Sequence, residues 1–281
     1  MEQKDIQKWS SVLNASRQKA LPISQISAQF QNHKSPLDLN EAYQIQDSGL
    51  AWRLSQGEKF LGYKMGLTSA AKRKQMNLDS PVFGSLTDRM RVSELRSLNN
   101  LIHPRIEPEI AFWIQGQLST NPSRAEVLAA TAGVCAGLEI VDSRFVATQP
   151  FSLWDLIADN SSAAFFALGA WQRNFAQLDL LNLPMTLHWN NQPVQVSNSG
   201  EISGDPVQSV IQLCQMLGQQ KRSLPASSLV LAGAPVAARP LEPNSVVRLE
   251  VSGLAPVELP VGAKIEDARE PTQKEAGKTE L

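Results

Sequence analysis

The chain has 281 residues, 42% of them apolar, and its 26 lysines and arginines nearly balance 27 aspartates and glutamates, for a formal net charge of −1. This length supports a sizeable core, whereas the balanced charge argues against nucleic acid or an anionic membrane surface as a partner. No apolar run approaches the roughly 20 residues that a membrane span needs. We therefore expect a cytoplasmic protein.

The first element with clear boundaries is a predicted helix near the N-terminus. Asp38 is placed to cap it, Glu41 completes a capping box, and Gly57 ends it. Together with the preceding residues, this helix predicts a small helical part over 1–58. Apolar side chains then alternate with glycine and lysine over 60–67, which is the period of a half-buried strand.

The middle of the chain mixes helix and strand signals. A helix is expected directly after the first strand, and the segment 80–88 is typical of a loop. A second strand is predicted at 106–113. The capping-box pattern at Ser123 then predicts an apolar helix through Gly137 that leads directly into a strand at 138–142.

The C-terminal half is rich in strands and contains one well-marked helix, which opens with Asp205 as cap and Pro206 in its first turn. Because the strands cluster and no glycine-rich phosphate turn follows any of them, we predict a mixed α+β fold over 59–262. The charged tail, 263–281, is predicted to be disordered. The expected strands are 163–169, a hairpin over 185–197, 228–233, 246–251 and 257–261.

Two glutamates spaced i, i+2 form the first candidate site. On a strand, Glu107 and Glu109 would lie on one face about 7 Å apart, and Glu139 interrupts another apolar strand, where an unpaired charge is costly to bury. Three carboxylates suit Mg²⁺ or Mn²⁺. The alternative is that such a pair arises by chance and is simply solvated.

Lys64 is the second candidate. Its neighbours on the same strand face, Gly62 and Gly66, leave room for a ligand beside it. A lysine there could hold a substrate carboxylate or stabilise an enolate. The alternative is an edge-strand lysine that discourages aggregation, a common use of this residue.

Other chemistries find less support in the sequence. The histidines, His33, His103 and His188, lack zinc-ligand spacing. No GxSxG elbow is present. The two cysteines, Cys135 and Cys214, sit among apolar neighbours and form no CxxC pair, which is typical of buried, inert thiols.

Five strings taken together resemble the fumarylacetoacetate hydrolase superfamily, and within it the branch of 2-keto-4-pentenoate hydratases and 4-oxalocrotonate decarboxylases. The resemblance implies a mixed β-roll fold, a Mg²⁺ or Mn²⁺ site at the three glutamates, an active-site role for Lys64, and substrate-binding roles for Leu67, Val82 and Ser161. The strings are GYKMGLTS (62–69), FGSLTD (83–88), LIHPRIEPEIAF (101–112), LEIVDSR (138–144) and ADNSS (158–162).

The resemblance also bears on the reaction. Hydratases of this branch carry an aspartate where this chain has Val82, which cannot manage protons. The prediction is therefore decarboxylation of a 2-oxohexenedioate to 2-hydroxypenta-2,4-dienoate and CO₂. Alternatives are a 2-keto-4-pentenoate hydratase and a non-catalytic partner subunit of the same fold.

Assembly and one departure from the family pattern complete these expectations. The resemblance implies a homo-oligomer, and a complex with a companion hydratase. The loop 197–206 departs from the pattern, because Ser197 and Ser199 replace glycines and Asp205 replaces a histidine. Side chains there could narrow the pocket.

Overall fold

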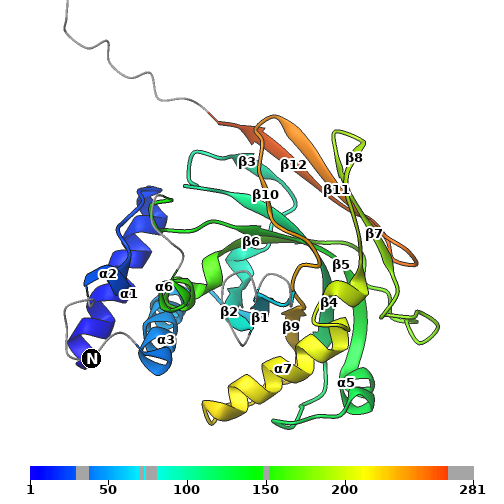
Figure 1. Ribbon diagram of the computed structural model, residues 1–281, viewed down its shortest axis with the longest axis horizontal. Helices are drawn as coiled ribbons and strands as arrows, with labels where there is room; N and C mark the ends of the chain where they lie inside the picture. Colours follow the sequence, from blue (N-terminus) through cyan, green and yellow to red (C-terminus); the bar gives the residue numbers. More distant parts are fainter. Residues whose placement is uncertain (30–37, 70–72, 74–80, 148–151, 265–281) are drawn as a thin grey trace, which may run out of the picture.

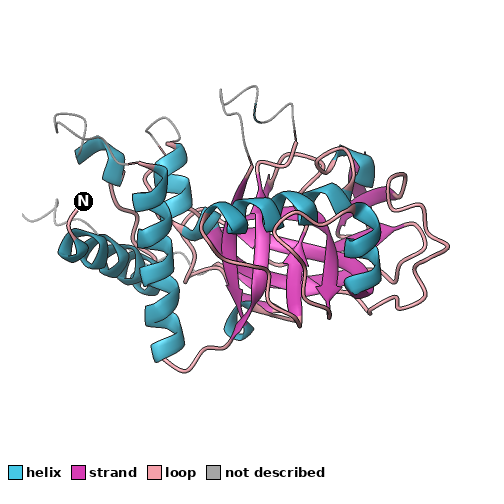
Figure 2. Cartoon of the chain, turned by 90° about the horizontal axis from the view of Figure 1, so that it is seen from below, coloured by secondary structure: helices cyan, strands magenta, loops and turns pink. Residues whose placement is uncertain are grey.

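The computed structural model describes residues 1–29, 38–69, 73, 81–147 and 152–264. Helices α1 (Gln3–Lys19), α2 (Ile26–Gln29) and α3 (Leu39–Ser55) form the N-terminal helical part, against which α6 (Leu153–Ala158) also packs. Figures 1 and 2 show these helices gathered at one side of the strands. The predicted capping box is confirmed, since Asp38 accepts from the backbone N–H of Glu41 and Glu41 returns the bond.

A strongly curled, seven-stranded sheet forms the main body. Its order is β2-β1-β9-β4-β5-β6, with β10 beside the start of β4. The sheet curls so far that Val92, beyond β2, donates its N–H to the carbonyl of Phe166 on β6 at 2.9 Å. One face of the sheet therefore lies on the inside of the curl. The strands are β1 (Phe60–Gly66), β2 (Val82–Thr87), β4 (Arg105–Ile114), β5 (Thr131–Val141), β6 (Ala163–Leu168), β9 (Ser228–Leu231) and β10 (Arg239–Pro240).

A second sheet and one helix cover the outer face of this curl. Helix α7 (Pro206–Gln219) presents Val207, Val210 and Cys214 to the core and lies across the strands in Figure 2. Burial of this apolar face is the main force that holds the layers together. The second sheet has the order β3 (Leu95–Ser97), β12 (Val257–Ala263), β11 (Ser245–Val251), β7 (Pro184–Trp189) and β8 (Gln192–Asn198). The predicted α+β roll with a small helical part is thus confirmed.

Two local predictions were wrong. Residues 82–87 form the buried strand β2 rather than a loop, because pairing with β1 outweighs the turn tendency of Gly84 and Ser85. The helix expected through Gly137 is only α5 (Arg124–Ala130), and β5 begins at Thr131. A strand buried on both faces has a continuous apolar run, which resembles a buried helix in sequence.

Some expectations fall outside the described residues or stay predictions. Most of the helix expected after β1 and the tail from 265 onward lie outside them, while Ala263 ends β12. The division into 1–58 and 59–262 remains a prediction. Among the helices that the structure describes, none is long and apolar enough to cross a bilayer.

Candidate metal centre and active site

Three carboxylates converge on the inner face of the curled sheet. Strands β4 and β5 pair antiparallel with Glu107 directly opposite Glu139, and Glu109 follows two residues along β4. One carboxylate oxygen from each residue lies within 4.8 Å of the others. Ile106 and Ile110 pack into the core on the opposite face, as the period of a strand requires. The structure therefore brings together the three predicted glutamates.

The proline between the two β4 glutamates lies where no ladder bond is lost. The carbonyl of Ile110 accepts from Ala232 on the β9 side of β4, so the missing N–H of Pro108 faces that same side. There β9 has ended and β10 has not yet begun. The chain between them donates the N–H of Gly233 to Glu109 Oε2 at 2.8 Å. Gly233 has φ +100°, which favours glycine.

Lys64 joins this cluster from the far side of the curl. Its Nζ lies 3.0 Å from Glu139 Oε2, and its side chain is 2% exposed. Strand β1 lies between β2 and β9, so the reading of Lys64 as an edge-strand lysine is wrong. Strands β9 and β4 separate β1 from β5, and only the curl lets the two side chains meet.

The electrostatics of the cluster are dominated by burial. Burial, followed by the charge of Glu139, raises the pKa of Glu109 well above its usual value. Burial likewise raises the pKa of Glu139, although the Lys64 ammonium opposes the shift. Burial disfavours the charged form of Lys64, but the three carboxylates, Glu139 foremost, outweigh it and raise its pKa. Lys64 is therefore an ammonium.

These residues fit a hard divalent cation. Among the described residues, no hydrogen-bond donor reaches Glu109 Oε1 or Glu139 Oε1, although both atoms are buried. Buried oxygens without donors are costly unless a cation binds them. With all three glutamates ionised, the one ammonium leaves two negative charges, which a divalent ion balances. An all-oxygen donor set of this kind is typical of Mg²⁺ or Mn²⁺.

Lys64 is held by an unusual turn that follows α6. Asn160, Ser161 and Ser162 all have φ between 53° and 56°, a region that residues other than glycine rarely enter. Lys64 Nζ lies 3.2 Å from the Ser161 carbonyl and 3.4 Å from its hydroxyl. The Asn160 side chain pairs with both backbone groups of Ser85, at 2.7 and 2.9 Å, and so ties the turn to β2.

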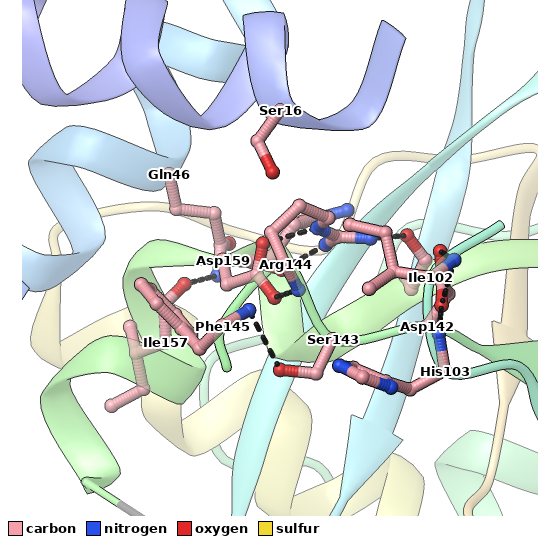
Figure 3. A network of polar contacts seen from close by, with 12 residues as sticks. Ser16, Gln46, Ile102, His103, Asp142, Ser143, Arg144, Phe145, Ile157 and Asp159 are labelled. Atoms are coloured by element: carbon pink, nitrogen blue, oxygen red, sulfur yellow. Dashed lines mark hydrogen bonds and ion pairs between the residues drawn. The ribbon is translucent and has the colours of Figure 1, made fainter. Parts of the chain in front are cut away.

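A buried ion pair supports the same turn. The backbone N–H of Arg144 donates to Asp159 Oδ2 at 3.1 Å, and its guanidinium binds the other oxygen of that carboxylate (Figure 3). Asp142, the residue that follows β5, accepts from the backbone N–H groups of Ile102 and His103 and so fixes the segment that leads into β4 (Figure 3).

The remaining predicted residues lie around Gly66. A methyl group at Gly66 would meet Ser161 Oγ at 2.7 Å, Val82 Cγ2 at 3.1 Å and Lys64 Nζ at 3.7 Å. Val82 is buried and pairs with Gly66 across β2 and β1. Leu67 follows with φ 57°, and its carbonyl accepts from Arg73 at 2.8 Å. Lys64, Val82 and Ser161 thus surround one small space.

Two of the departures in loop 197–206, Ser199 and Asp205, have structural explanations. Ser199 is buried, accepts from the N–H of Leu183 and donates to the carbonyl of Leu180, both at 2.8 Å. Asp205 caps α7 and forms an ion pair with Arg124 at 2.8 Å. Both side chains therefore support the local fold.

Three residues near the site were not predicted from the sequence as site residues. Arg144 and Asp159 lie in strings that carried the resemblance, but their mutual contact had no local signal. Arg105 stands two residues before Glu107, so the period of the strand could have placed it on the same face.

Comparisons with known proteins identify the family of the chain. The family described as fumarylacetoacetate (FAA) hydrolase C-terminal matches residues 84–262. A 4-oxalocrotonate decarboxylase from a Pseudomonas species is 38% identical over 218 residues, 77% of this chain and 84% of that protein. A 2-keto-4-pentenoate hydratase from Paraburkholderia xenovorans (strain LB400) is 32% identical, with coverage of 79% and 83%.

A solved structure shows the same fold over almost the whole chain. The 4-oxalocrotonate decarboxylase from Pseudomonas putida G7, complexed with magnesium and adipate, superposes with a TM-score of 0.87 at 26% identity, covering 93% of this chain and 98% of that one. That relative therefore binds a divalent metal ion. The chain belongs to the fumarylacetoacetate hydrolase superfamily, in the branch that contains the 4-oxalocrotonate decarboxylases and 2-keto-4-pentenoate hydratases.

Proposed function

We propose that this protein is a metal-dependent lyase that converts a 2-oxohexenedioate to 2-hydroxypenta-2,4-dienoate and CO₂. The observation that carries the proposal is the buried meeting of Glu107, Glu109 and Glu139 with Lys64. The three carboxylates would hold Mg²⁺ or Mn²⁺. When bound, the cation supplies an electron sink for the carbonyl group of a 2-oxo acid.

Lys64 and Ser161 have distinct tasks in the proposed reaction. Lys64 places a fixed ammonium beside the carboxylates, where it would stabilise negative charge that develops on the 2-oxo group as CO₂ leaves. Ser161 fixes that ammonium through its carbonyl and hydroxyl. The reaction cleaves one carbon–carbon bond, leaves its electron pair in the conjugated chain, and takes up one proton at the oxo oxygen.

Val82 favours decarboxylation over hydration. It is an apolar side chain beside Gly66, close to where Lys64 Nζ lies. Addition of water to a dienoate needs a group that moves protons, and valine has none. A hydratase remains the second candidate, because a hydratase relative matches over 79% of the chain.

The test is turnover of the oxo-diacid by purified protein. With Mg²⁺ it should release CO₂, and EDTA or Glu107→Ala should abolish the release. Lys64→Ala should still bind Mn²⁺ while its kcat falls about 100-fold or more. Water addition to 2-hydroxypenta-2,4-dienoate without CO₂ release would support the hydratase instead, and metal binding without turnover of either substrate would support a non-catalytic subunit.

Location and assembly remain predictions. We expect a cytoplasmic homo-oligomer that also associates with a companion hydratase. Size-exclusion chromatography with light scattering, on the protein alone and mixed with such a hydratase, would test both forms of assembly.

A further inference from the structure

A pocket of about 310 Å³ is lined by residues from the start of β4, the end of β5 and α6. Its walls are largely apolar and include Val141, Phe145, Val146 and Leu156, and its polar groups include the guanidinium of Arg105. None of the three glutamates lines the pocket. The proposed reaction so far assigns it no task.

Strand register connects this pocket to the metal carboxylates. The pair Glu107 and Glu139 is followed, two residues further along both strands, by the directly opposed pair Arg105 and Val141. Side chains two residues apart share a face, so Arg105 and Val141 continue the face of the glutamates. The step between the pairs is about 7 Å. Ser162 also lines the pocket, next to the Ser161 that holds Lys64.

The charged and polar groups of the pocket are held in place. Arg105 donates through Nε at 3.2 Å and Nη2 at 2.6 Å to the carbonyl of Ala238, which leaves the N–H groups of Nη1 outside this contact. Asp142 fixes the backbone of His103, whose imidazole points toward Ser143 in Figure 3. His103 and Ser143 both line the pocket.

The carboxylate in the lining is directed elsewhere. Asp155 is buried and accepts from the backbone N–H groups of Ile26 and Ser27, at 2.8 and 3.1 Å, and from the Ser27 hydroxyl. Its charge is thereby committed to the first turn of α2. Arg105, which carries a permanent positive charge, therefore sets the preference of the pocket for an anion.

We infer that this pocket binds the second carboxylate of a dicarboxylic 2-oxo acid, and that Arg105 determines specificity for diacids over monoacids. The inference rests on the proposed function, because it places the 2-oxo acid end at the three glutamates. A six-carbon chain separates its two carboxyl carbons by about 6 Å when extended. That length matches the step from the Glu107 pair to the Arg105 pair.

The inference predicts a particular kinetic signature. The second carboxylate loses its charge as CO₂ leaves, so Arg105 stabilises the bound substrate more than the transition state. Arg105→Gln should therefore raise KM for the diacid about tenfold or more, without lowering kcat. Arg105→Lys should restore most of the affinity. Arg89→Gln, which removes another exposed arginine outside the pocket, should change neither constant.

Binding to the Mn²⁺-loaded, full-length protein separates this inference from the proposed function. Calorimetry would compare oxalate, 2-oxoadipate and 2-oxohexanoate. Wild type should prefer the diacid to the monoacid, and Arg105→Gln should lose that preference while its affinity for oxalate is unchanged. A diacid preference that survives Arg105→Gln would overturn this inference alone. If wild type bound neither oxalate nor either of the two oxo acids, the proposed function would be overturned as well.

Discussion

Gly66→Ala tests whether the small space beside Lys64 matters for activity. The added methyl would lie 2.7 Å from Ser161 Oγ, so the hydroxyl must retreat by roughly 0.5–1 Å to reach an ordinary contact. That hydroxyl lies 3.4 Å from Lys64 Nζ. Displacements of this size in an active site cost up to about 100-fold in rate. We expect kcat/KM to fall about 10- to 100-fold, while the free energy of unfolding changes by less than about 1 kcal/mol.

A double-mutant cycle identifies the cause. If the loss arises from the Ser161 hydroxyl, adding Gly66→Ala to Ser161→Ala should cost little beyond Ser161→Ala alone. Gly49→Ala is the matched control, because its new methyl would come no closer than 3.7 Å to Ser10 Oγ on the neighbouring helix. It should retain full activity. Wild-type kcat/KM in Gly66→Ala, or losses that multiply across the cycle, would refute the reasoning.

Three further predictions follow from burial and capping. Asp205→Ala should lower the free energy of unfolding by about 1 kcal/mol in urea titrations, because Asp205 caps α7. The affinity for Mn²⁺ should not change, and a changed affinity would show that loop 197–206 contributes to the metal centre. Burial raises the pKa of Cys135 and Cys214 to about 12, so both are protonated thiols at about pH 8; iodoacetamide should label them only in denaturant, and rapid labelling of the native protein would count against this burial. Burial raises the pKa of Glu109 and Glu139, so each holds a proton above the usual pH range of a carboxyl group and releases it as the pH rises. Mn²⁺ affinity, measured by calorimetry, should therefore still increase with pH above that range, and a flat profile would contradict this prediction.

The parts of the site that depend on local spacing could be predicted from the sequence. The i, i+2 spacing of Glu107 and Glu109 is enough to put both on one face once a strand is recognised. The cap residues Asp38 and Asp205 likewise act within three residues of their own position. These interactions are decided within a few residues of the chain.

The parts that depend on the curl of the sheet could not. Lys64 meets Glu139 across two intervening strands, and no pattern within either segment encodes the curvature that joins them. The left-handed turn around Ser161 is equally hidden, because it is held from outside by Ser85 and Arg144. Strand β2 was mistaken for a loop for the same reason, since its partner β1 decides its conformation.

In the proposed active site, Glu107, Glu109 and Glu139 share one divalent cation with a 2-oxo acid. Anomalous diffraction from crystals soaked in Mn²⁺ and oxalate, which mimics the two oxygen donors of such an acid, tests it most directly. We predict one manganese peak among the three carboxylates, with oxalate oxygens completing its coordination, and no such peak in Glu139→Gln. Manganese bound elsewhere, or no peak between these side chains in the wild-type protein, would contradict the account.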